Sequence, residues 1–262
     1  MRPEEITPYD HTRGKTEQVR EMFDNIAPAY DRLNRAMSLG QDRRWRRRAV
    51  ATVAAGRPAR IIDIATGTGD FAISLARAIP GAAITGLDLS EGMIAIGRSK
   101  IAAAGLAGRV ELVVGDCLNP PAGIGGADAV TVAFGVRNFA DLAAGYRAMR
   151  DMLRPGGLLC VIELSTPASA LVRPFYNLYT RGVIPAMGRL VSRDRRAYSY
   201  LPESIAAVPR GDAMLELMRG AGFTDTAFRT LTFGVCTIYT GRRPGGESSI
   251  EKQSPEPSTY KS

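Results

Sequence analysis

The residues best suited to chemistry lie in 61–70, where an apolar run ends in a Gly-x-Gly turn flanked by carboxylates. Gly67 and Gly69 form the turn, Asp63 precedes it and Asp70 follows it. Glycine lets a backbone approach a ligand closely, because it lacks Cβ and tolerates positive φ. A turn that opens a helix normally attracts phosphate, since free N–H groups and the helix dipole favour anions. Two carboxylates would repel a pyrophosphate, so the turn predicts a ligand that carries positive charge.

Further acids follow the next two strand-like runs. Asp88 comes about 20 residues after the turn, where an acid accepts hydrogen bonds from ribose hydroxyls. Asp116 ends the next run and could accept from an adenine amino group, with the Cys117 N–H as the matching donor. Ligands of open α/β sheets bind at the carboxyl ends of the strands. A nucleoside site that favours a cation predicts S-adenosylmethionine, whose amino group and sulfonium are positive.

Alternating apolar runs and helical patterns must position these residues. Strands are expected at 60–65, 83–87, 109–114, 129–134 and 158–164, with helices between them, which indicates a parallel sheet. Two final runs, 227–232 and 235–240, are separated only by Phe233 and Gly234 and predict an antiparallel hairpin. The predicted fold is α/β and Rossmann-like, with a seven-stranded, mostly parallel sheet.

The chain divides into a core and additions. Residues 1–14 are expected to be a flexible N-terminus, and 15–55 a helical lid before the first strand. Residues 56–243 form the predicted cofactor-binding domain, interrupted after the fifth strand by an aromatic and basic insertion at 165–203. Residues 244–262 have almost no core-forming side chains and predict a disordered tail.

Composition excludes several classes of protein. The 262 residues contain one histidine, His11, and three scattered cysteines, so a His-based metal site or triad and a redox pair are not expected. The cysteine usage suits a reducing cytoplasm, and we find no apolar run of about 18 residues that would span a membrane. The net charge of +8 includes two arginine clusters, at 43–48 and at 193–196. These clusters either bind an anionic surface or are ordinary solvated arginines.

Several motifs carry a resemblance to a known family over roughly residues 16–243. They are V-R-E-M-F-D-N-I-A-P-A-Y-D at 19–31, the glycine motif at 63–70, F-G-V-R-N at 134–138 and L-R-P-G-G at 153–157. Together they resemble class I methyltransferases, and more narrowly the ubiquinone/menaquinone biosynthesis C-methyltransferase family. By position, the resemblance places cofactor contacts at Thr68, Asp88, Asp116 and Cys117. A serine that family members often have before F-G-x-R-N is Ala133 here.

The resemblance implies methylation of a ring carbon of a prenylated quinol. The lead segment is similar to members of the menaquinone route, which favours demethylmenaquinol, the last intermediate of that route; the benzoquinol of the ubiquinone route is the alternative. A ring carbon becomes nucleophilic when the adjacent hydroxyl loses its proton, so the acceptor must be reduced. The hypothesis is that Arg137 stabilises the phenolate and Asn138 orients the ring oxygen. Tyr30 would close the pocket and relay the proton.

Competing interpretations remain open. Gly67, Gly69 and Ala72 also match the dinucleotide fingerprint of an oxidoreductase. A nucleic-acid methyltransferase would need base-recognition elements that the chain lacks, so no nucleic-acid partner is expected. A sterol or other small-molecule methyltransferase and a non-catalytic binding module are further alternatives. The insertion could form a channel for the isoprenoid tail or a capping subdomain. The expected location is the cytoplasm, with docking at the inner face of the cell membrane as an option, and the oligomeric state, a homodimer included, stays open.

Overall fold

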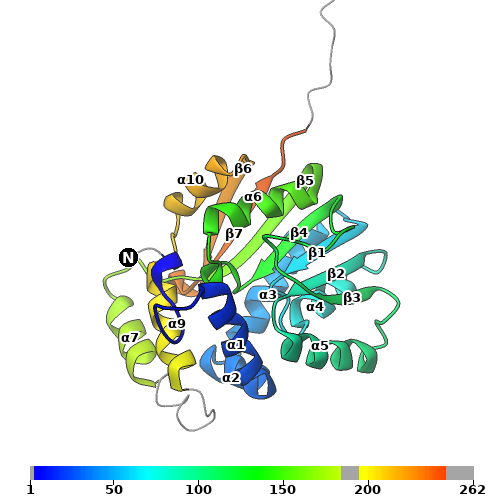
Figure 1. Cartoon of the computed structure of the whole chain (residues 1–262). Helices are drawn as coiled ribbons and strands as arrows, with labels where there is room; N and C mark the ends of the chain where they lie inside the picture. Colours follow the sequence, from blue (N-terminus) through cyan, green and yellow to red (C-terminus); the bar gives the residue numbers. More distant parts are fainter. Residues whose placement is uncertain (1–2, 184–194, 246–262) are drawn as a thin grey trace, which may run out of the picture.

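The computed structural model describes residues 3–183 and 195–245. A seven-stranded sheet with the order β3-β2-β1-β4-β5-β7-β6 forms its centre (Figure 1). The strands are β1 (Arg60–Ile64), β2 (Ala83–Asp88), β3 (Val110–Val114), β4 (Ala127–Ala133), β5 (Leu153–Leu164), β6 (Thr224–Leu231) and β7 (Cys236–Arg242). This is the predicted α/β fold, and its mostly parallel sheet is confirmed.

The sheet is parallel from β3 to β5 and antiparallel beyond it. β1 pairs with both β2 and β4, so the strand order reverses direction between β1 and β4. β7 runs antiparallel to β5 and to β6, which confirms the expected C-terminal hairpin. In a sheet of this kind the reversal opens a crevice beyond the carboxyl ends of the strands. The crevice therefore lies where β1 and β4 end.

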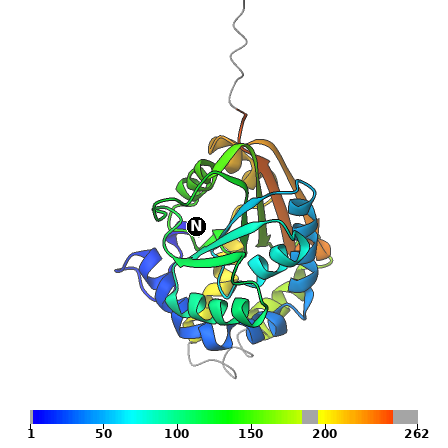
Figure 2. The same cartoon turned by 90° about the vertical axis from the view of Figure 1, so that its right-hand side faces the viewer.

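Helices cover both faces of the sheet (Figure 2). The core on one face joins Trp45, Phe71 and Ile94, which come from α3 (Gln41–Ala54), α4 (Asp70–Ala78) and α5 (Glu91–Ala103). The core on the other face joins Met149 and Met218 from α6 (Leu142–Met152) and α10 (Asp212–Gly220). Their apolar stripes recur at helical spacing, so each helix buries one side against the strands.

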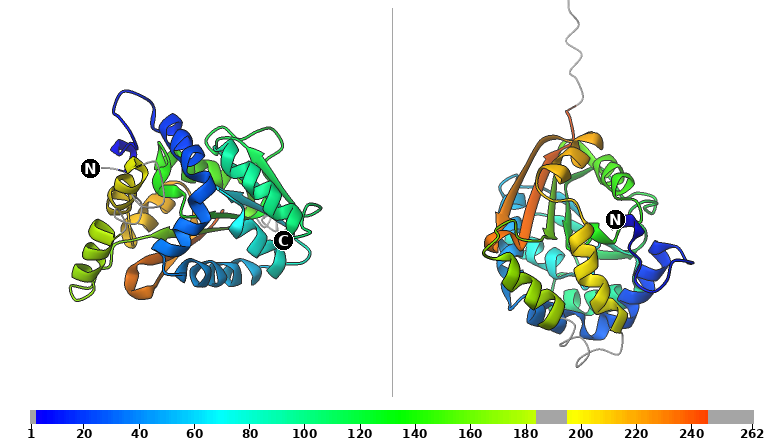
Figure 3. Two further views of the ribbon diagram at one scale, coloured as in Figure 1. Left: turned by 90° about the horizontal axis from the view of Figure 1, so that it is seen from below. Right: turned by 90° about the vertical axis from the view of Figure 1, so that its left-hand side faces the viewer.

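A third group of helices covers the carboxyl end of the sheet. It comprises α1 (Lys15–Ile26), α2 (Tyr30–Met37), α7 (Arg173–Leu178) and α9 (Arg195–Ala207), and Figure 3 shows them across that end. Met22, Leu33 and Tyr200 form a small apolar core of their own there. Segments before the first strand and after the fifth strand thus meet above the crevice.

The N-terminal segment departs from the sequence prediction. Residues 1–14 were expected to be flexible, but Pro3 and Ile6 are buried. The side-chain amide of Gln18, fully buried on α1, accepts hydrogen bonds from the N–H groups of Tyr9 and Asp10, each at 2.9 Å. A polar side chain that satisfies backbone groups in this way fixes the segment to α1.

The fifth strand begins earlier than the sequence predicts. The L-R-P-G-G segment was expected to separate a helix from a strand beginning at 158, yet α6 ends at Met152 and β5 begins at Leu153. The predicted disordered tail lies outside the described residues from 246 onward, as does the part of the insertion at 184–194. Among the residues that are described, no helix combines the length and the apolar character needed to cross a bilayer.

Candidate active site

The glycine turn adopts the backbone that its sequence predicts. Gly67 and Gly69 have φ of 57° and 77°, in the left-handed region that glycine tolerates. Two residues with side chains also adopt positive φ, Ala65 at 51° after β1 and Phe134 at 62° after β4. Such strain persists only where the surroundings impose it, and it gathers at functional sites. Both residues lie at the reversal of strand order.

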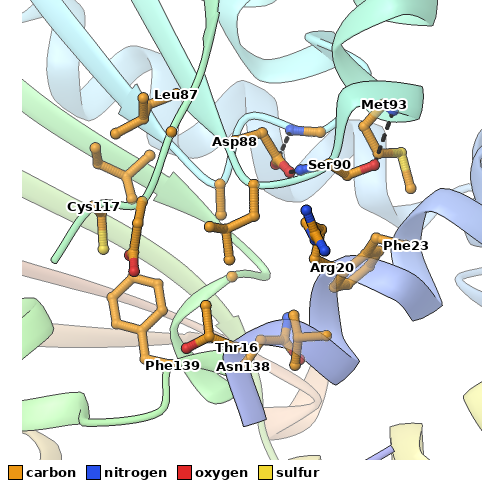
Figure 4. A pocket seen from close by; sticks show the side chains of 18 of the residues that line it. Thr16, Arg20, Phe23, Leu87, Asp88, Ser90, Met93, Cys117, Asn138 and Phe139 are labelled. Atoms are coloured by element: carbon orange, nitrogen blue, oxygen red, sulfur yellow. Dashed lines mark hydrogen bonds between the residues drawn. The ribbon is translucent and has the colours of Figure 1, made fainter. Parts of the chain in front are cut away.

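A pocket opens at this point between α1 and the ends of four strands; we call it the donor pocket (Figure 4). Its floor comes from the loops after β1, β2, β3 and β4, and its cover comes from α1. The lining includes Thr16, Arg20, Phe23, Tyr30, Ala65, Gly67, Asp88, Ser90, Met93, Asp116, Cys117, Phe134 and Asn138. Strand ends and lid therefore enclose one site.

Asp88 is held firmly at the end of β2. Its Oδ2 accepts from the Gly67 N–H at 2.7 Å, and its Oδ1 accepts from the Ser90 N–H at 2.9 Å. Burial raises the pKa of Asp88. The Ser90 hydroxyl caps α5 by accepting from the Met93 N–H at 3.0 Å. The carboxylate is oriented by backbone groups, and its remaining lone pairs can accept from ligand hydroxyls.

Asp116 and Cys117 follow β3, the strand next to β2, and line the donor pocket. Asp116 Oδ1 accepts from the Leu118 N–H at 2.9 Å, which turns the chain after the strand. Burial raises the pKa of the Cys117 thiol to about 12, so this cysteine stays a neutral thiol rather than a nucleophile. Its contribution to a ligand is packing and its backbone groups.

The acids beside the glycine turn do not face the donor pocket. Asp63 is buried beneath the turn, where Thr131 and Thr66 donate to its carboxylate at 2.6 and 2.7 Å. Burial raises its pKa to about 6. Asp70 is paired with Lys100 on α5, and Arg46 lies 3.6 Å away. The argument that Asp63 and Asp70 attract the cation directly is therefore wrong in position, since Asp88 and Asp116 are the acids in the lining.

Thr68 is also used within the protein. Its hydroxyl donates to Asp31 Oδ1 at 2.6 Å and accepts from the Lys100 ammonium at 3.0 Å. Lys100 in turn lies 2.7 Å from Asp31 Oδ2. This network ties α2, the glycine turn and α5 together. Of the residues expected to contact the cofactor, Asp63, Thr68 and Gly69 thus lie outside the lining of the donor pocket and support it from below.

A second cavity of about 310 Å³ adjoins the donor pocket; we call it the acceptor cavity. Tyr30 and Phe134 belong to the lining of both, so these two aromatic side chains stand at their junction. The rest of the lining is mostly apolar or aromatic. It includes Met37, Leu39, Trp45, Leu164, Val172, Tyr176, Tyr179, Leu201, Ile205 and Val235, together with the polar residues Asn34, Ser38, Asp42, Arg46, Arg137 and Thr180.

Arg137 lies in the wall of the acceptor cavity rather than in the donor pocket. Its guanidinium pairs with the carboxylate of Glu163 on β5 at 2.8 Å, and both side chains are buried. Burial by itself would lower the pKa of Arg137, but the charge of Glu163 raises it overall. The arginine therefore stays charged, and it lines the cavity while paired with Glu163.

Tyr30 and Asn138 complete the residues expected to act in catalysis. Burial raises the pKa of Tyr30, so its phenol stays protonated and acts as a donor at neutral pH. The Asn138 side chain lines the donor pocket, and its Oδ1 accepts from the Tyr200 hydroxyl of α9 at 3.1 Å. The structure thus brings Tyr30, Asn138 and Arg137 to the region between the two cavities.

Sequence reasoning missed several lining residues. Thr16, Arg20 and Phe23 of α1 and Ser90 and Met93 of α5 line the donor pocket, and none of them was proposed as a site residue. The spacing of Asp42 and Arg46 is a recognisable i, i+4 pair that could have marked α3 as part of the site. In the described part of the chain, no group of three or more metal-ligating side chains is close enough to hold an ion.

Comparison with known proteins agrees with this geometry. The profile of the ubiE/COQ5 methyltransferase family matches residues 11–243. A demethylmenaquinone methyltransferase of Bacteroides fragilis is 45% identical over 240 residues, covering 92% of this chain and 98% of that protein. A ubiquinone/menaquinone biosynthesis C-methyltransferase UbiE of Geobacter sulfurreducens is 45% identical over 239 residues, covering 91% and 93%.

The fold is shared more widely. The crystal structure of the [4+2]-cyclase SpnF matches with a TM-score of 0.65 at 19% identity, covering 88% of this chain and 97% of that one. At such low identity the likeness concerns the fold alone. The family match, in contrast, spans the lid, the sheet and the C-terminal hairpin, and the predicted resemblance is confirmed. The chain belongs to the ubiE/COQ5 methyltransferase family and is an S-adenosylmethionine-dependent methyltransferase.

Proposed function

We propose that this enzyme methylates a ring carbon of demethylmenaquinol, a prenylated naphthoquinol, to give menaquinol. The observation that carries the proposal is the junction of the two cavities, where a nucleoside-type pocket and an apolar cavity share Tyr30 and Phe134. Relatives named demethylmenaquinone methyltransferase, at 45% identity over most of the chain, support the naphthoquinol as acceptor.

The donor pocket fits S-adenosylmethionine. In this proposal Asp88 accepts hydrogen bonds from the ribose hydroxyls and Asp116 accepts one from the adenine amino group. No Cβ stands over Gly67, where the nearest side-chain atom to an added Cβ would be the Tyr30 Cε1 at 3.8 Å. When bound, this cofactor supplies an electrophilic methyl group on a sulfonium. The task of the protein is to align the acceptor with it and to exclude water.

The acceptor cavity suits an aromatic ring with an isoprenoid tail. Its lining is mostly apolar, and its buried charged residues are Asp42, Arg46 and Arg137. In this proposal Arg137 stabilises the phenolate and Asn138 orients the ring oxygen. Tyr30, which belongs to the lid, closes the pocket and donates a hydrogen bond. Residues 15–55 act as the lid over both cavities, and the described parts of the insertion, 165–183 and 195–203, close the outer side of the acceptor cavity.

The direct test is a methyl-transfer assay with demethylmenaquinol and the corresponding benzoquinol of the ubiquinone route, offered side by side under reducing conditions. We expect transfer to the naphthoquinol and none to either oxidised quinone, because a quinone ring is electrophilic. Faster transfer to the benzoquinol would favour the alternative acceptor. Transfer to neither quinol would overturn the proposal.

We further propose that the enzyme collects its lipid acceptor at the inner face of the cell membrane. Several exposed apolar side chains surround the acceptor cavity: Leu39, Leu171, Phe175, Leu178 and Phe233. On α7 and the two residues before it, Val172 and Tyr176 line the cavity, whereas Leu171, Phe175 and Leu178 are exposed. Arginines 43, 44, 47 and 48 on α3 are also exposed and would favour anionic lipid.

Vesicle co-sedimentation tests this docking. The wild type should bind vesicles with anionic headgroups at low salt and less at high salt. Phe175→Ser with Leu178→Ser should weaken binding, whereas Val114→Ser, which changes an exposed apolar residue on β3, should not. Equal binding by the rim variant and the wild type would contradict the proposal.

A further inference from the structure

Two arginine side chains in the acceptor cavity carry hydrogen-bond donors that nothing in the protein satisfies. Among the side chains that the structure describes, the buried nitrogen and oxygen atoms without a partner are Arg46 Nε and Arg137 Nε. Both residues line the acceptor cavity, and both are more than nine-tenths buried. An unsatisfied buried donor costs roughly 1–3 kcal/mol. Two such unsatisfied donors in one cavity indicate that a bound molecule supplies the hydrogen-bond acceptors for them.

Arg46 has a second feature that Arg137 lacks, a carboxylate that also lines the cavity. Its Nη1 lies 2.7 Å from Asp42 Oδ2, one helical turn earlier on α3. The Ser38 hydroxyl donates to Asp42 Oδ1 at 2.9 Å. The Arg46 guanidinium lies 5.7 Å from the ring centre of Phe134, the residue shared with the donor pocket. The Asp42–Arg46 pair therefore lies next to the junction at which the two cavities meet.

Asp42 is the one carboxylic acid among the described residues that line this cavity. Glu163, behind Arg137, is occupied by that guanidinium and by the Leu164 N–H at 2.8 Å. The phenol of Tyr30 stays protonated because burial raises its pKa. The only histidine of the chain is His11, in the N-terminal segment. A group able to accept a proton inside the cavity is thus found on α3.

We propose that Asp42 accepts the proton of the acceptor hydroxyl and that Arg46 holds the phenolate oxygen that results. The inference rests on the proposed function, since it assigns groups to the same quinol. The O–H bond of the hydroxyl breaks, the proton bonds to the Asp42 carboxylate, and the electron pair stays on the ring system. No oxidant or further reactant is needed. Arg137, whose Nε also lacks a partner, stabilises the same negative charge, as in the proposed function.

Several titratable groups face this pair and define its electrostatics. Arg46 lies on the same helix, and Asp70 at the start of α4 lies 3.6 Å from Arg46. Across the cavity are Arg137, Tyr30, Tyr176 and Tyr179. Asp70 is already paired with Lys100, so Asp42 and Arg46 together carry no net charge before the acceptor binds. When Asp42 takes up a proton, the charge of Arg46 loses its nearest carboxylate and can stabilise the phenolate.

The first experiment needs neither cofactor nor turnover. The probe is 1-naphthol, whose absorbance changes on ionisation, bound to the full-length enzyme and titrated with base. Arg46→Gln should raise the pH at which the bound probe ionises by about one unit or more, and Asp42→Asn should lower it. Arg77→Gln and Asp151→Asn, exposed residues of the same types, should leave it unchanged. If neither α3 variant moves the titration, the inference is wrong.

The second experiment follows the reaction. Asp42→Asn should reduce kcat about 10²-fold or more, while calorimetry finds unchanged affinity for S-adenosylmethionine, because Asp42 lies outside the donor pocket. Ser38→Ala removes one donor from the carboxylate, so the acidic limb of the kcat profile should move to higher pH. Arg46→Lys keeps the charge and should recover part of the activity lost in Arg46→Gln. Thermal unfolding shows whether each variant is folded. If Asp42→Asn does not fold, Ser38→Ala tests the role of Asp42 in its place.

The two proposals fail in distinguishable ways. A wild-type enzyme that methylates neither quinol contradicts the proposed function, whatever the variants do. An active wild type whose Asp42→Asn variant keeps its kcat, or whose Ser38→Ala variant keeps its pH profile, contradicts the role of Asp42 alone. A shifted naphthol titration together with a lost kcat supports the assignment of both residues.

Discussion

Replacing Glu163 with glutamine removes the charge that neutralises Arg137 inside the wall of the acceptor cavity. The two side chains are 2% and 8% exposed, and their closest atoms are 2.8 Å apart. Glutamine keeps the size of the side chain, so the change isolates the charge. Arg137 would remain buried with no anionic partner in its ion pair, which is the costly outcome for a guanidinium.

The expected loss follows from the geometry. Charges about 4 Å apart interact by about 4 kcal/mol at an effective dielectric constant of about 20. Breaking a buried pair by removing one partner typically costs about 3–5 kcal/mol. We therefore expect Glu163→Gln to lower the free energy of unfolding by about 4 kcal/mol. For a domain of this size that corresponds to a fall in Tm on the order of 8–16 °C.

The assay is unfolding in urea, which adds no ions, followed by circular dichroism. Asp151→Asn is the matched control, because its pair with Arg150 has the same 2.8 Å separation but is 31% and 60% exposed. A surface pair of this kind contributes roughly 0–1 kcal/mol. The double variant Glu163→Gln with Arg137→Met removes both charges and should be more stable than Glu163→Gln alone.

Two results would refute this reasoning. One is a Glu163→Gln variant within about 1 kcal/mol of the wild type, which would mean that water reaches the pair. The other is strict additivity in the double-mutant cycle, which would mean that the two charges do not stabilise each other.

Three further predictions concern turnover, pH and the glycine turn. Arg137→Ala should reduce turnover about 10²-fold or more, and near-normal turnover would remove Arg137 from the mechanism. Burial raises the pKa of Asp63 from 3.8 to about 6, so the folded state holds this proton more tightly and stability falls as pH rises across that window. The free energy of unfolding of Asp63→Asn should therefore rise by up to about 3 kcal/mol relative to that of the wild type as the pH goes from about 4 to about 7. If urea unfolding gives the same difference between variant and wild type at both pH values, this prediction is wrong. In Gly97→Ala the new Cβ would lie 2.5 Å from Leu112 Cδ1 and 3.2 Å from the Thr68 carbonyl carbon. The displaced turn should weaken binding of S-adenosylmethionine in calorimetry, and unchanged affinity would show that Leu112 alone gives way.

Local patterns explain why much of the fold could be predicted. The alternation of apolar runs and helical stripes sets the order of strands and helices, and Phe233 with Gly234 leaves room only for a tight turn between β6 and β7. The acids Asp88 and Asp116 follow strands, and parallel strands end at one edge of a sheet. Their meeting in one pocket is therefore a consequence of the topology.

Charge partners could not be predicted in the same way. Asp63 and Asp70 flank the glycine turn in the sequence, yet the fold directs Asp63 to Thr66 and Thr131 and directs Asp70 to Lys100 on another helix. Whether a carboxylate faces a ligand or a neighbouring side chain depends on which helices and strands pack beside it. The spacing of residues along the chain does not contain that information.

The sequence by itself determined the α/β fold, the family and the edge of the sheet where the donor binds, because these depend on periodicity and on motifs contiguous in the chain. Only the tertiary structure decided that Arg137 is paired with Glu163, 26 residues away, and that Arg46 and Asp42 line the same cavity. The physical reason is that ion pairing and desolvation depend on distances between elements brought together by folding. Those distances decide which charged groups remain available to a substrate.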